Sequence, residues 1–205
     1  MSSKFSLLLS YVLHPLLMPF YTVAVVMNLN TYIAYSVSPQ AQRILLSLVF
    51  FTTAVLPVLT ALILLQKGMI KTLHMDSLNE RRFPFLSACA YYFFCYYLLQ
   101  RMPVPRMLSL LVLGAAIAIF IAWAFSYSWK ISIHMIGIGG FAGALYGLAQ
   151  ILNADLLPVI MMVVVLAGLL GTARLTSGSH TPGQILTGFV VGFLCEWVVL
   201  YGFSI

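Results

Sequence analysis

The sequence predicts an all-α fold, a polytopic membrane helical bundle in which about seven transmembrane helices form a single domain. Hydrophobic residues make up 62% of the 205 residues, and charged residues only 7%, whereas soluble domains have about 25% charged residues. Apolar runs of about twenty residues recur along the chain, and a helix of that length crosses the roughly 30 Å hydrocarbon layer of a bilayer. We therefore expect one integral membrane domain over residues 1–205.

Seven apolar runs are predicted to be the membrane crossings, with boundaries uncertain by a few residues. An earlier apolar stretch, 5–13, has no small-residue cleavage pattern after it, so we expect it to be retained. The predicted crossings are 16–35, 44–65, 84–99, 104–127, 131–152, 156–172 and 185–202.

The polar segments between these crossings are expected to share one membrane face. Each crossing reverses the side, so segments 66–83, 126–134 and 174–183, which are two crossings apart, lie together. This face has many hydrogen-bond donors and few carboxylates, so it is suited to bind a phosphate. The guanidinium group of Arg can donate to two phosphate oxygens at once, and Lys adds a compact positive charge. Taken singly, each cation has a simpler interpretation as an interfacial anchor. The cations and histidines of this face are Lys67, Lys71, Arg81, Arg82, Lys130, Arg174, His134 and His180.

Three motifs on this face resemble, in order, those of the type-2 phosphatidic acid phosphatase superfamily, over about residues 67–192. Five residues separate Arg174 from His180, as in the third motif of the family, but Ala173 stands in place of the family Ser and Gln184 in place of its Asp. The pair Ser132 and His134 keeps the Ser-x-His spacing of the second motif without its Pro and Gly. The sequence Arg81-Arg82-Phe83-Pro84 stands for the Arg-Pro of the first.

The resemblance implies a metal-independent lipid phosphatase with a six-helix core, spanning about residues 40–205, and the first crossing as an addition. His180 would attack phosphorus, His134 would protonate the leaving lipid oxygen, and Gln184 would orient the imidazole in place of the family carboxylate. Glu80, on the same face, is a candidate to supply the missing carboxylate. The phosphate ligands would be Arg174, Arg82, Arg81, Lys71 and Ser132.

The resemblance also implies a location and partners. The site would face the periplasm of a bacterial inner membrane, and the substrate would be a lipid phosphate or a polyprenyl diphosphate reached from the bilayer. No metal, cofactor or nucleic-acid partner is expected. Two alternatives remain open: a non-catalytic phospholipid-binding or transport protein of the same fold, suggested by Gln184, and a haem-binding electron carrier that uses His134 and His180.

The sequence also predicts local structure around these residues. Pro182 suits the first turn of a helix, and Gly178 permits a bend that brings Arg174 towards His180. Ser132 and His134 share a face only if the chain is extended there before a helix begins. Glycines at 137–143 and 188–192 are expected to let two helices pack closely. We expect His14 to be interfacial or capping, and Glu196 to face the bundle or the far interface.

Overall fold

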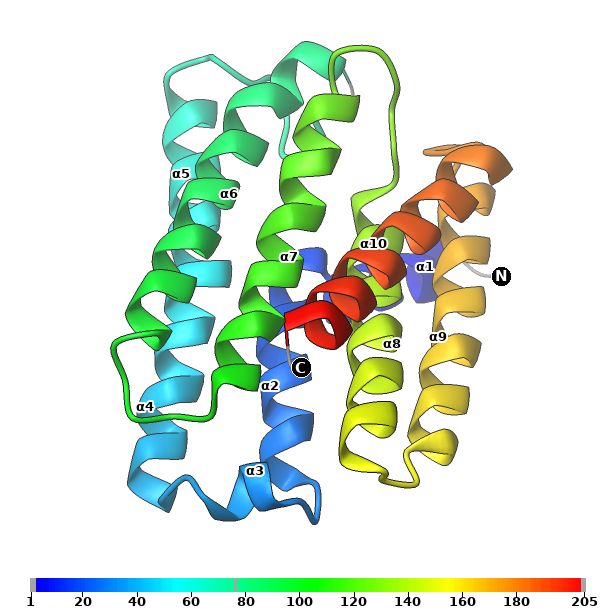
Figure 1. The fold of residues 1–205 in the computed structure, drawn as a ribbon. Coiled ribbons are helices and arrows are strands. Elements are labelled where there is room, and N and C mark those ends of the chain that lie inside the picture. Colours follow the sequence, from blue (N-terminus) through cyan, green and yellow to red (C-terminus); the bar gives the residue numbers. More distant parts are fainter. Residues whose placement is uncertain (1–2, 76, 204–205) are drawn as a thin grey trace.

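The computed structural model describes residues 3–75 and 77–203, and within these ranges all regular structure is helical (Figure 1). The fold is therefore the predicted all-α polytopic bundle. Its elements are α1 (Ser3–Val12), the 3-10 helix η1 (Pro15–Leu17), α2 (Met18–Asn28), α3 (Tyr32–Tyr35), α4 (Pro39–Phe50), the π-helical turn η2 (Phe51–Val55), α5 (Leu56–Gln66), α6 (Leu78–Leu99), α7 (Arg106–Phe125), α8 (Ile133–Leu152), α9 (Leu157–Thr176) and α10 (Pro182–Phe203).

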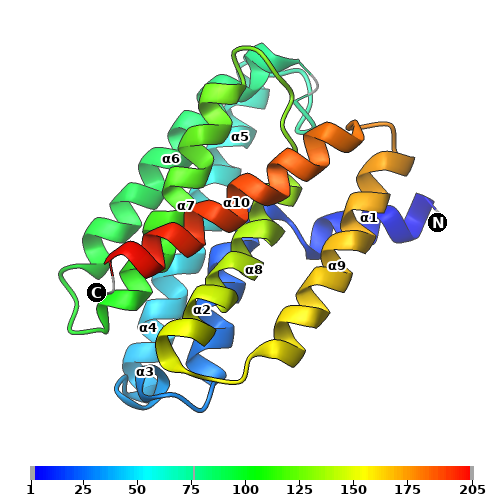
Figure 2. The same ribbon diagram turned by 45° about the vertical axis from the view of Figure 1, so that its right-hand side comes forward.

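Six helical stretches of the described chain are long and apolar enough to cross a membrane, which makes the protein an integral membrane protein. The predicted crossing at 84–99 corresponds to α6, which is not among the six. Nevertheless α6 packs between α5 and α7 and runs alongside both (Figures 1 and 2). The six stretches are Lys4–Asn28, Pro39–Gln66, Arg106–Phe125, Ile133–Leu152, Leu157–Thr176 and Pro182–Phe203.

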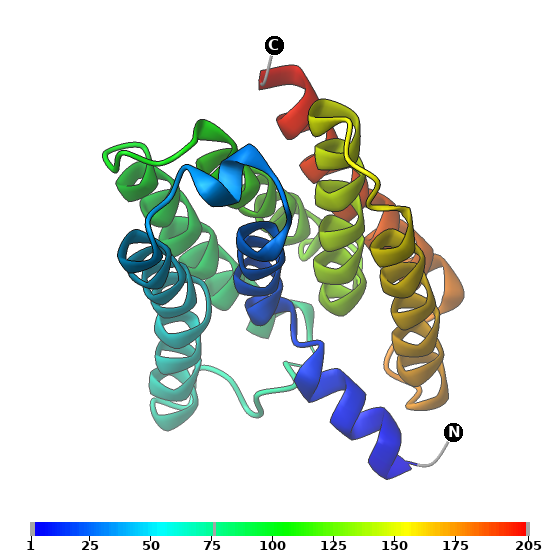
Figure 3. The same ribbon diagram turned by 90° about the horizontal axis from the view of Figure 1, so that it is seen from below.

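The prediction for the first crossing, 16–35, is wrong in its boundaries. The helical stretch begins before residue 16 and is broken at His14, whose backbone is extended (φ −67°, ψ 135°). The residue before a proline is disfavoured in the helical region, and Pro15 lacks the N–H that would continue the helix. As a result α1 turns away from α2 and lies against α9, as seen from below in Figure 3. The chain then leaves α2 at Asn28, before the separate short helix α3.

The N-terminal segment also belongs to the packed bundle. Helix α2 packs against α4, α7 and α8. Val23, Val26 and Leu45 are completely buried in the main apolar cluster, which also includes residues of α6, α7, α8 and α10. The segment before residue 40 therefore contributes side chains to the main apolar cluster.

The second crossing, α4 to α5, contains a π-helical turn at a proline. Pro57 has no N–H to donate to the carbonyl of Thr53 four residues earlier, and the helix widens over Phe51–Val55. The hydroxyl of Tyr92 on α6 donates to that carbonyl at 3.3 Å. A side chain from a neighbouring helix thus satisfies the acceptor that the proline leaves open.

Helices α8 and α10 cross at very short range, as the glycine pattern predicted. A Cβ on Gly139 or Gly143 would collide with the carbonyls of Phe189 and Phe193, and a Cβ on Gly192 would collide with the carbonyl of Ile136. The two helices therefore pack backbone against backbone at these glycines, and the start of α8 is held against the start of α10.

The predicted sidedness of the loops is confirmed. In Figure 1, the segments 67–75, 126–132 and 177–181 all lie towards the upper side of the bundle, whereas 29–38, 100–105 and 153–156 lie at its lower end. The three segments that carry the family-like motifs therefore share one face.

Candidate functional site

The turn between α9 and α10 folds Arg174 back towards the loop that follows it. Arg174 lies in the last turn of α9, and Gly178 adopts a φ of +65°, which residues with a Cβ rarely adopt. The bend that follows brings Ser179 to the guanidinium, where Arg174 Nη2 donates to Ser179 Oγ at 2.8 Å. The predicted bend at Gly178 is confirmed.

Helix α10 starts at Pro182, as predicted, and its first turn is a capping box. The Thr181 hydroxyl accepts from the Gln184 N–H at 3.4 Å, and Gln184 Oε1 accepts from the Thr181 N–H at 3.1 Å. This reciprocal pair satisfies two N–H groups that a helix start otherwise leaves open. The backbone N–H can only donate, so the Gln184 atom facing it is the amide oxygen.

The same amide oxygen fixes the tautomer of His180. His180 Nδ1 lies 3.2 Å from Gln184 Oε1 and 3.3 Å from the carbonyl oxygen of Lys130. Both neighbours are acceptors, so Nδ1 carries the proton and donates it. In the neutral ring, Nε2 then keeps its lone pair, which is the form that a nitrogen nucleophile requires.

The surroundings of His180 keep the ring neutral at pH 7. Burial lowers the pKa of His180 to about 4; the hydrogen bond with Gln184 opposes this fall, and the positive charges of Arg81, Arg174 and Lys130 add to it. Three cations from three different segments therefore lie close enough to act on one imidazole.

The start of α8 brings the second predicted motif to the same place. Ser132 is extended (φ −83°, ψ 106°), and α8 begins at Ile133, so the predicted break before the helix is confirmed. The Ser132 N–H donates to the Gln184 carbonyl at 3.4 Å. His134 lies in the first turn of α8, close enough to Arg174 and His180 to interact with both electrostatically.

Helix α1 supplies a part of the site that the sequence did not reveal. Ser10 Oγ accepts from Arg174 Nη1 at 3.1 Å, and the Ser10 carbonyl lies 3.3 Å from His134 Nε2. The ring of His14 meets the ring of His134 edge to face at 5.5 Å. The only sequence trace of this arrangement is that Ser6, Ser10 and His14 recur at intervals of four, a helical spacing, although α1 ends at Val12, before His14.

Two buried polar atoms in this cluster have no hydrogen-bond partner within the described ranges, namely Ser132 Oγ and Arg174 Nε. Buried polar groups are rarely left unpaired in folded proteins, so each such atom needs an explanation. Both can donate, and both belong to the predicted phosphate ligands. An anion placed between them would satisfy both.

The first predicted motif lies on the same face but contributes differently. Arg81 is 6% exposed and donates from Nε to the Met75 carbonyl at 2.8 Å and from Nη1 to the Ile131 carbonyl at 3.4 Å, tying two of the loops together. The guanidinium of Arg82 stacks 4.3 Å over the ring of Tyr127, and its Nε is buried without a hydrogen-bond partner in the described chain. Lys71 is exposed in the loop before α6.

The predicted residues thus fall into two groups. His180, Gln184, Arg174, Ser132 and His134 form one connected cluster, whereas Arg82 and Lys71 lie in the neighbouring segments of the face. Glu80, the candidate for the missing carboxylate, lies in the first turn of α6. The oxygen atoms next to His180 Nδ1 are those of the Lys130 carbonyl and the Gln184 side chain.

An interior cavity of about 220 Å³ lies beside the cluster and not within it. Of the predicted site residues, all of which fall in the described ranges, Arg81 alone lines this cavity. We place the candidate site by the contacts around His180, because these join the residues that can carry out chemistry.

No protein family, curated protein or solved structure was found to match this chain. The resemblance to the phosphatase superfamily therefore depends on the motif residues alone.

Proposed function

We propose that the protein is an integral membrane lipid phosphatase that hydrolyses a phosphate monoester or diphosphate head group through a phosphohistidine, without a metal. One observation supports this most directly. Two carbonyl oxygens hold the proton of His180 on Nδ1, so that Nε2 is a free nucleophile among cations and unpaired donors.

The proposed reaction has two steps. In the first, the Nε2 lone pair of His180 attacks phosphorus and the bond from phosphorus to the lipid oxygen breaks. His134, which takes up a proton when the anionic substrate binds beside it, gives that proton to the lipid oxygen. In the second, water attacks the phosphohistidine, its proton passes to His134, and the P–N bond breaks. Phosphate and a lipid alcohol, or a lipid monophosphate from a diphosphate, are the products, and both histidines return to their starting forms.

The surrounding groups are suited to the charge that develops on the phosphoryl oxygens. Arg174 Nε and Ser132 Oγ are already buried without partners, so they would donate to these oxygens without first breaking bonds to the protein. Arg81 and Lys130 add positive charge nearby. Gln184 can orient the imidazole by accepting from Nδ1, but it carries no charge to stabilise a cationic ring.

Lipid access and orientation complete the proposal. Helices α1 and α9 carry Ser10 and Arg174 and have exposed apolar side chains, among them Leu7, Leu8 and Val165, so a lipid head group would reach the site from the bilayer. We propose that the site faces the periplasm of a bacterial inner membrane.

The test is release of phosphate in EDTA from phosphatidic acid and from a polyprenyl diphosphate. The wild-type protein is compared with His180→Asn, whose amide nitrogen can replace the Nδ1 donor to Gln184 but offers no nucleophile. His74→Asn, in an exposed loop position, is the matched control. We expect release by the wild type and the control, and a loss of at least about a thousandfold in His180→Asn, the scale seen when members of a catalytic triad are removed. Equal release by His180→Asn would remove the proposed nucleophile.

A second candidate function, phospholipid binding or transport without hydrolysis, is favoured by the uncharged Gln184 at the position of the family carboxylate. This function predicts no release from either lipid, together with binding of phosphatidic acid vesicles that is weakened by Arg174→Gln.

A further inference from the structure

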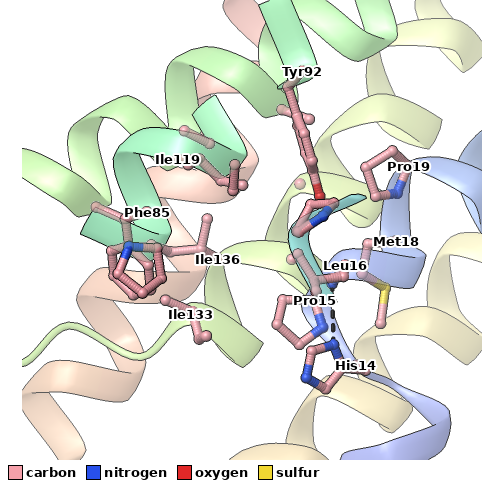
Figure 4. Close-up of a pocket in the computed structure, with 18 of the residues that line it drawn as sticks. His14, Pro15, Leu16, Met18, Pro19, Phe85, Tyr92, Ile119, Ile133 and Ile136 are labelled. Carbon is pink, nitrogen blue, oxygen red and sulfur yellow. Dashed lines mark hydrogen bonds between the residues drawn. The ribbon is translucent and has the colours of Figure 1, made fainter. Parts of the chain in front are cut away.

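The interior cavity lies between the loop face and the middle of the bundle. It has a volume of about 220 Å³ and is bounded by η1, α2, α5, α6, α7, α8 and one residue of α10. In Figure 4, Phe85, Ile119, Ile133 and Ile136 stand on one side of it, and Pro15, Leu16 and Pro19 on the other. Its walls are therefore mostly apolar, and its polar groups are few.

The polar groups at the loop end of the cavity are basic. Arg81, His14 and His74 line this end, next to the loop that precedes α6. The His14 Nδ1 accepts from the Leu16 N–H at 3.3 Å, so in the neutral ring the proton is on Nε2. An anionic or hydrogen-bond-accepting group suits this end.

The polar groups at the inner end offer acceptors. Tyr92 donates its hydroxyl proton to the Thr53 carbonyl at 3.3 Å, and Thr22 donates to the Met18 carbonyl at 2.8 Å. Both hydroxyl protons are thus used inside the protein, while the oxygen lone pairs remain. Tyr92 lies eleven residues after Arg81 on α6, which corresponds to about 16 Å along the helix.

Glu196 is the third group of the inner end. It is 5% exposed, it lines the cavity, and its Oε2 is buried without a hydrogen-bond partner in the described ranges. Two glycines make room for it: a Cβ on Gly114 would lie 2.5 Å from Oε2, and a Cβ on Gly140 would lie 3.4 Å from Cγ. Gly114 precedes Ala115, the lining residue of α7 farthest from the loop face, which places Glu196 at the deep end.

Burying a carboxyl group without a hydrogen-bond partner inside a membrane bundle costs free energy, and a bound ligand that donates to it would offset this cost. We propose that the cavity binds a single-chain amphiphile that has an anionic group at one end and a hydroxyl group at the other, with the hydroxyl donating to Glu196 and the anion facing Arg81. The two ends of the cavity match the two ends of such a molecule, and the apolar walls match its chain. A hydroxyl suits Glu196 better than an ammonium group, since an ammonium would have to pass Arg81 and lose its hydration.

This proposal shares only Arg81 with the phosphatase proposal, and its test does not depend on hydrolysis, because the preference for a hydroxyl is carried by Glu196 and Tyr92. The probes are ω-hydroxydodecanoate and dodecanoate, whose extended chains are comparable to the rise of about 16 Å along α6 from Arg81 to Tyr92. Binding is measured with the full-length protein in phosphatidylcholine nanodiscs. We expect the hydroxylated probe to bind at least about tenfold more tightly, because a site built around a hydroxyl disfavours the analogue that lacks it.

The variants assign this preference to the carboxyl group. Glu196→Leu should bind both probes equally, and Glu196→Gln, whose amide oxygen still accepts, should keep part of the preference. Glu80→Gln, which removes a carboxylate outside the cavity lining, is the control and should behave as the wild type. If Glu196→Leu fails to fold, Tyr92→Phe should reduce the preference and Ala118→Leu, which fills the cavity, should weaken both probes. Equal binding of the two probes to the wild type, as expected for a cavity that holds only water, would overturn the proposal, and so would a preference that survives in Glu196→Leu.

Discussion

At the scale of single residues, Gln184 joins the helix cap to the imidazole. Its amide oxygen accepts from the Thr181 N–H and faces His180 Nδ1. A carboxylate at this position would keep both contacts and would also stabilise a positively charged ring. The amide therefore sets the tautomer of the proposed nucleophile without supplying the charge that would speed its reaction.

Gln184→Glu tests this separation of roles. The carboxylate keeps the geometry and stabilises charge on the ring, so we expect phosphate release to rise by at least about tenfold, since in serine proteases loss of the corresponding charge costs about 10⁴. Gln184→Leu removes the acceptor and should lower release below wild type. The measurement is the initial rate of release from phosphatidic acid in EDTA. Equal rates for Gln184→Glu and Gln184→Leu would show that the side chain does not act on His180.

The low pKa of His180 predicts how stability depends on pH. Its pKa falls from 6.5 to about 4, so between these values the unfolded chain binds a proton that the folded chain does not. The contribution of neutral His180 is complete above pH 6.5 and is lost as the pH falls towards 4. The free energy of unfolding should therefore fall more steeply over this interval in the wild type than in His180→Asn. In ¹⁵N-histidine NMR spectra of the folded protein, the signal assigned to His180 should titrate near pH 4. A midpoint near 6.5 would contradict this account.

At the scale of helices, the crossing of α8 and α10 positions the site. The contact depends on glycine, because the carbonyls of Ile136, Phe189 and Phe193 occupy the space in which a Cβ would lie. Ser132 directly precedes α8 and Gln184 lies in the first turn of α10, and the backbones of these two residues are directly hydrogen-bonded. Spreading this crossing would separate the two proposed catalytic histidines.

Gly192→Ala should therefore destabilise the protein. Its Cβ would collide with the Ile136 carbonyl, and overpacking of this kind typically costs about 1–3 kcal/mol. The matched control is Gly168→Ala on α9, where a Cβ meets nothing within 4 Å, so the change should be neutral or slightly stabilising. Thermal unfolding in detergent measures both. Similar melting temperatures for the two variants would mean that α8 and α10 can separate without cost.

At the scale of the whole molecule, the sequence predicts which loops share a membrane face, but it predicts only some of the residues that form the site. The loops were assigned by counting crossings, and Pro182 and Gly178 act locally on their own backbone, so the sequence was sufficient. Ser10 meets Arg174 across 164 residues of chain, and a lone serine in an apolar run carries no signal for such a contact. The sequence left Glu196 facing either the bundle or the far interface, and the cavity beside it could not be predicted because helices distant in sequence form it.

Labelling from the two membrane sides tests the whole arrangement. In a background in which Cys89, Cys95 and Cys195 are replaced by Ala, single cysteines are placed at exposed positions. Lys71→Cys, Ser128→Cys and Thr181→Cys should react with a membrane-impermeant maleimide from one side, the periplasmic side in the proposed orientation. Gln40→Cys and Arg101→Cys should react from the other. Labelling of Ser128→Cys and Thr181→Cys from opposite sides would disprove the common face.

The capping box links the order of the first turn of α10 to the tautomer of His180. If the first turn of α10 frays, Gln184 loses the Thr181 N–H and turns away, and His180 Nδ1 is left with the Lys130 carbonyl as its acceptor. The proton could then migrate to Nε2, which would silence the proposed nucleophile without any change in composition. Temperature or lipid conditions that loosen a single helical turn would in this way act as a chemical switch on the ring.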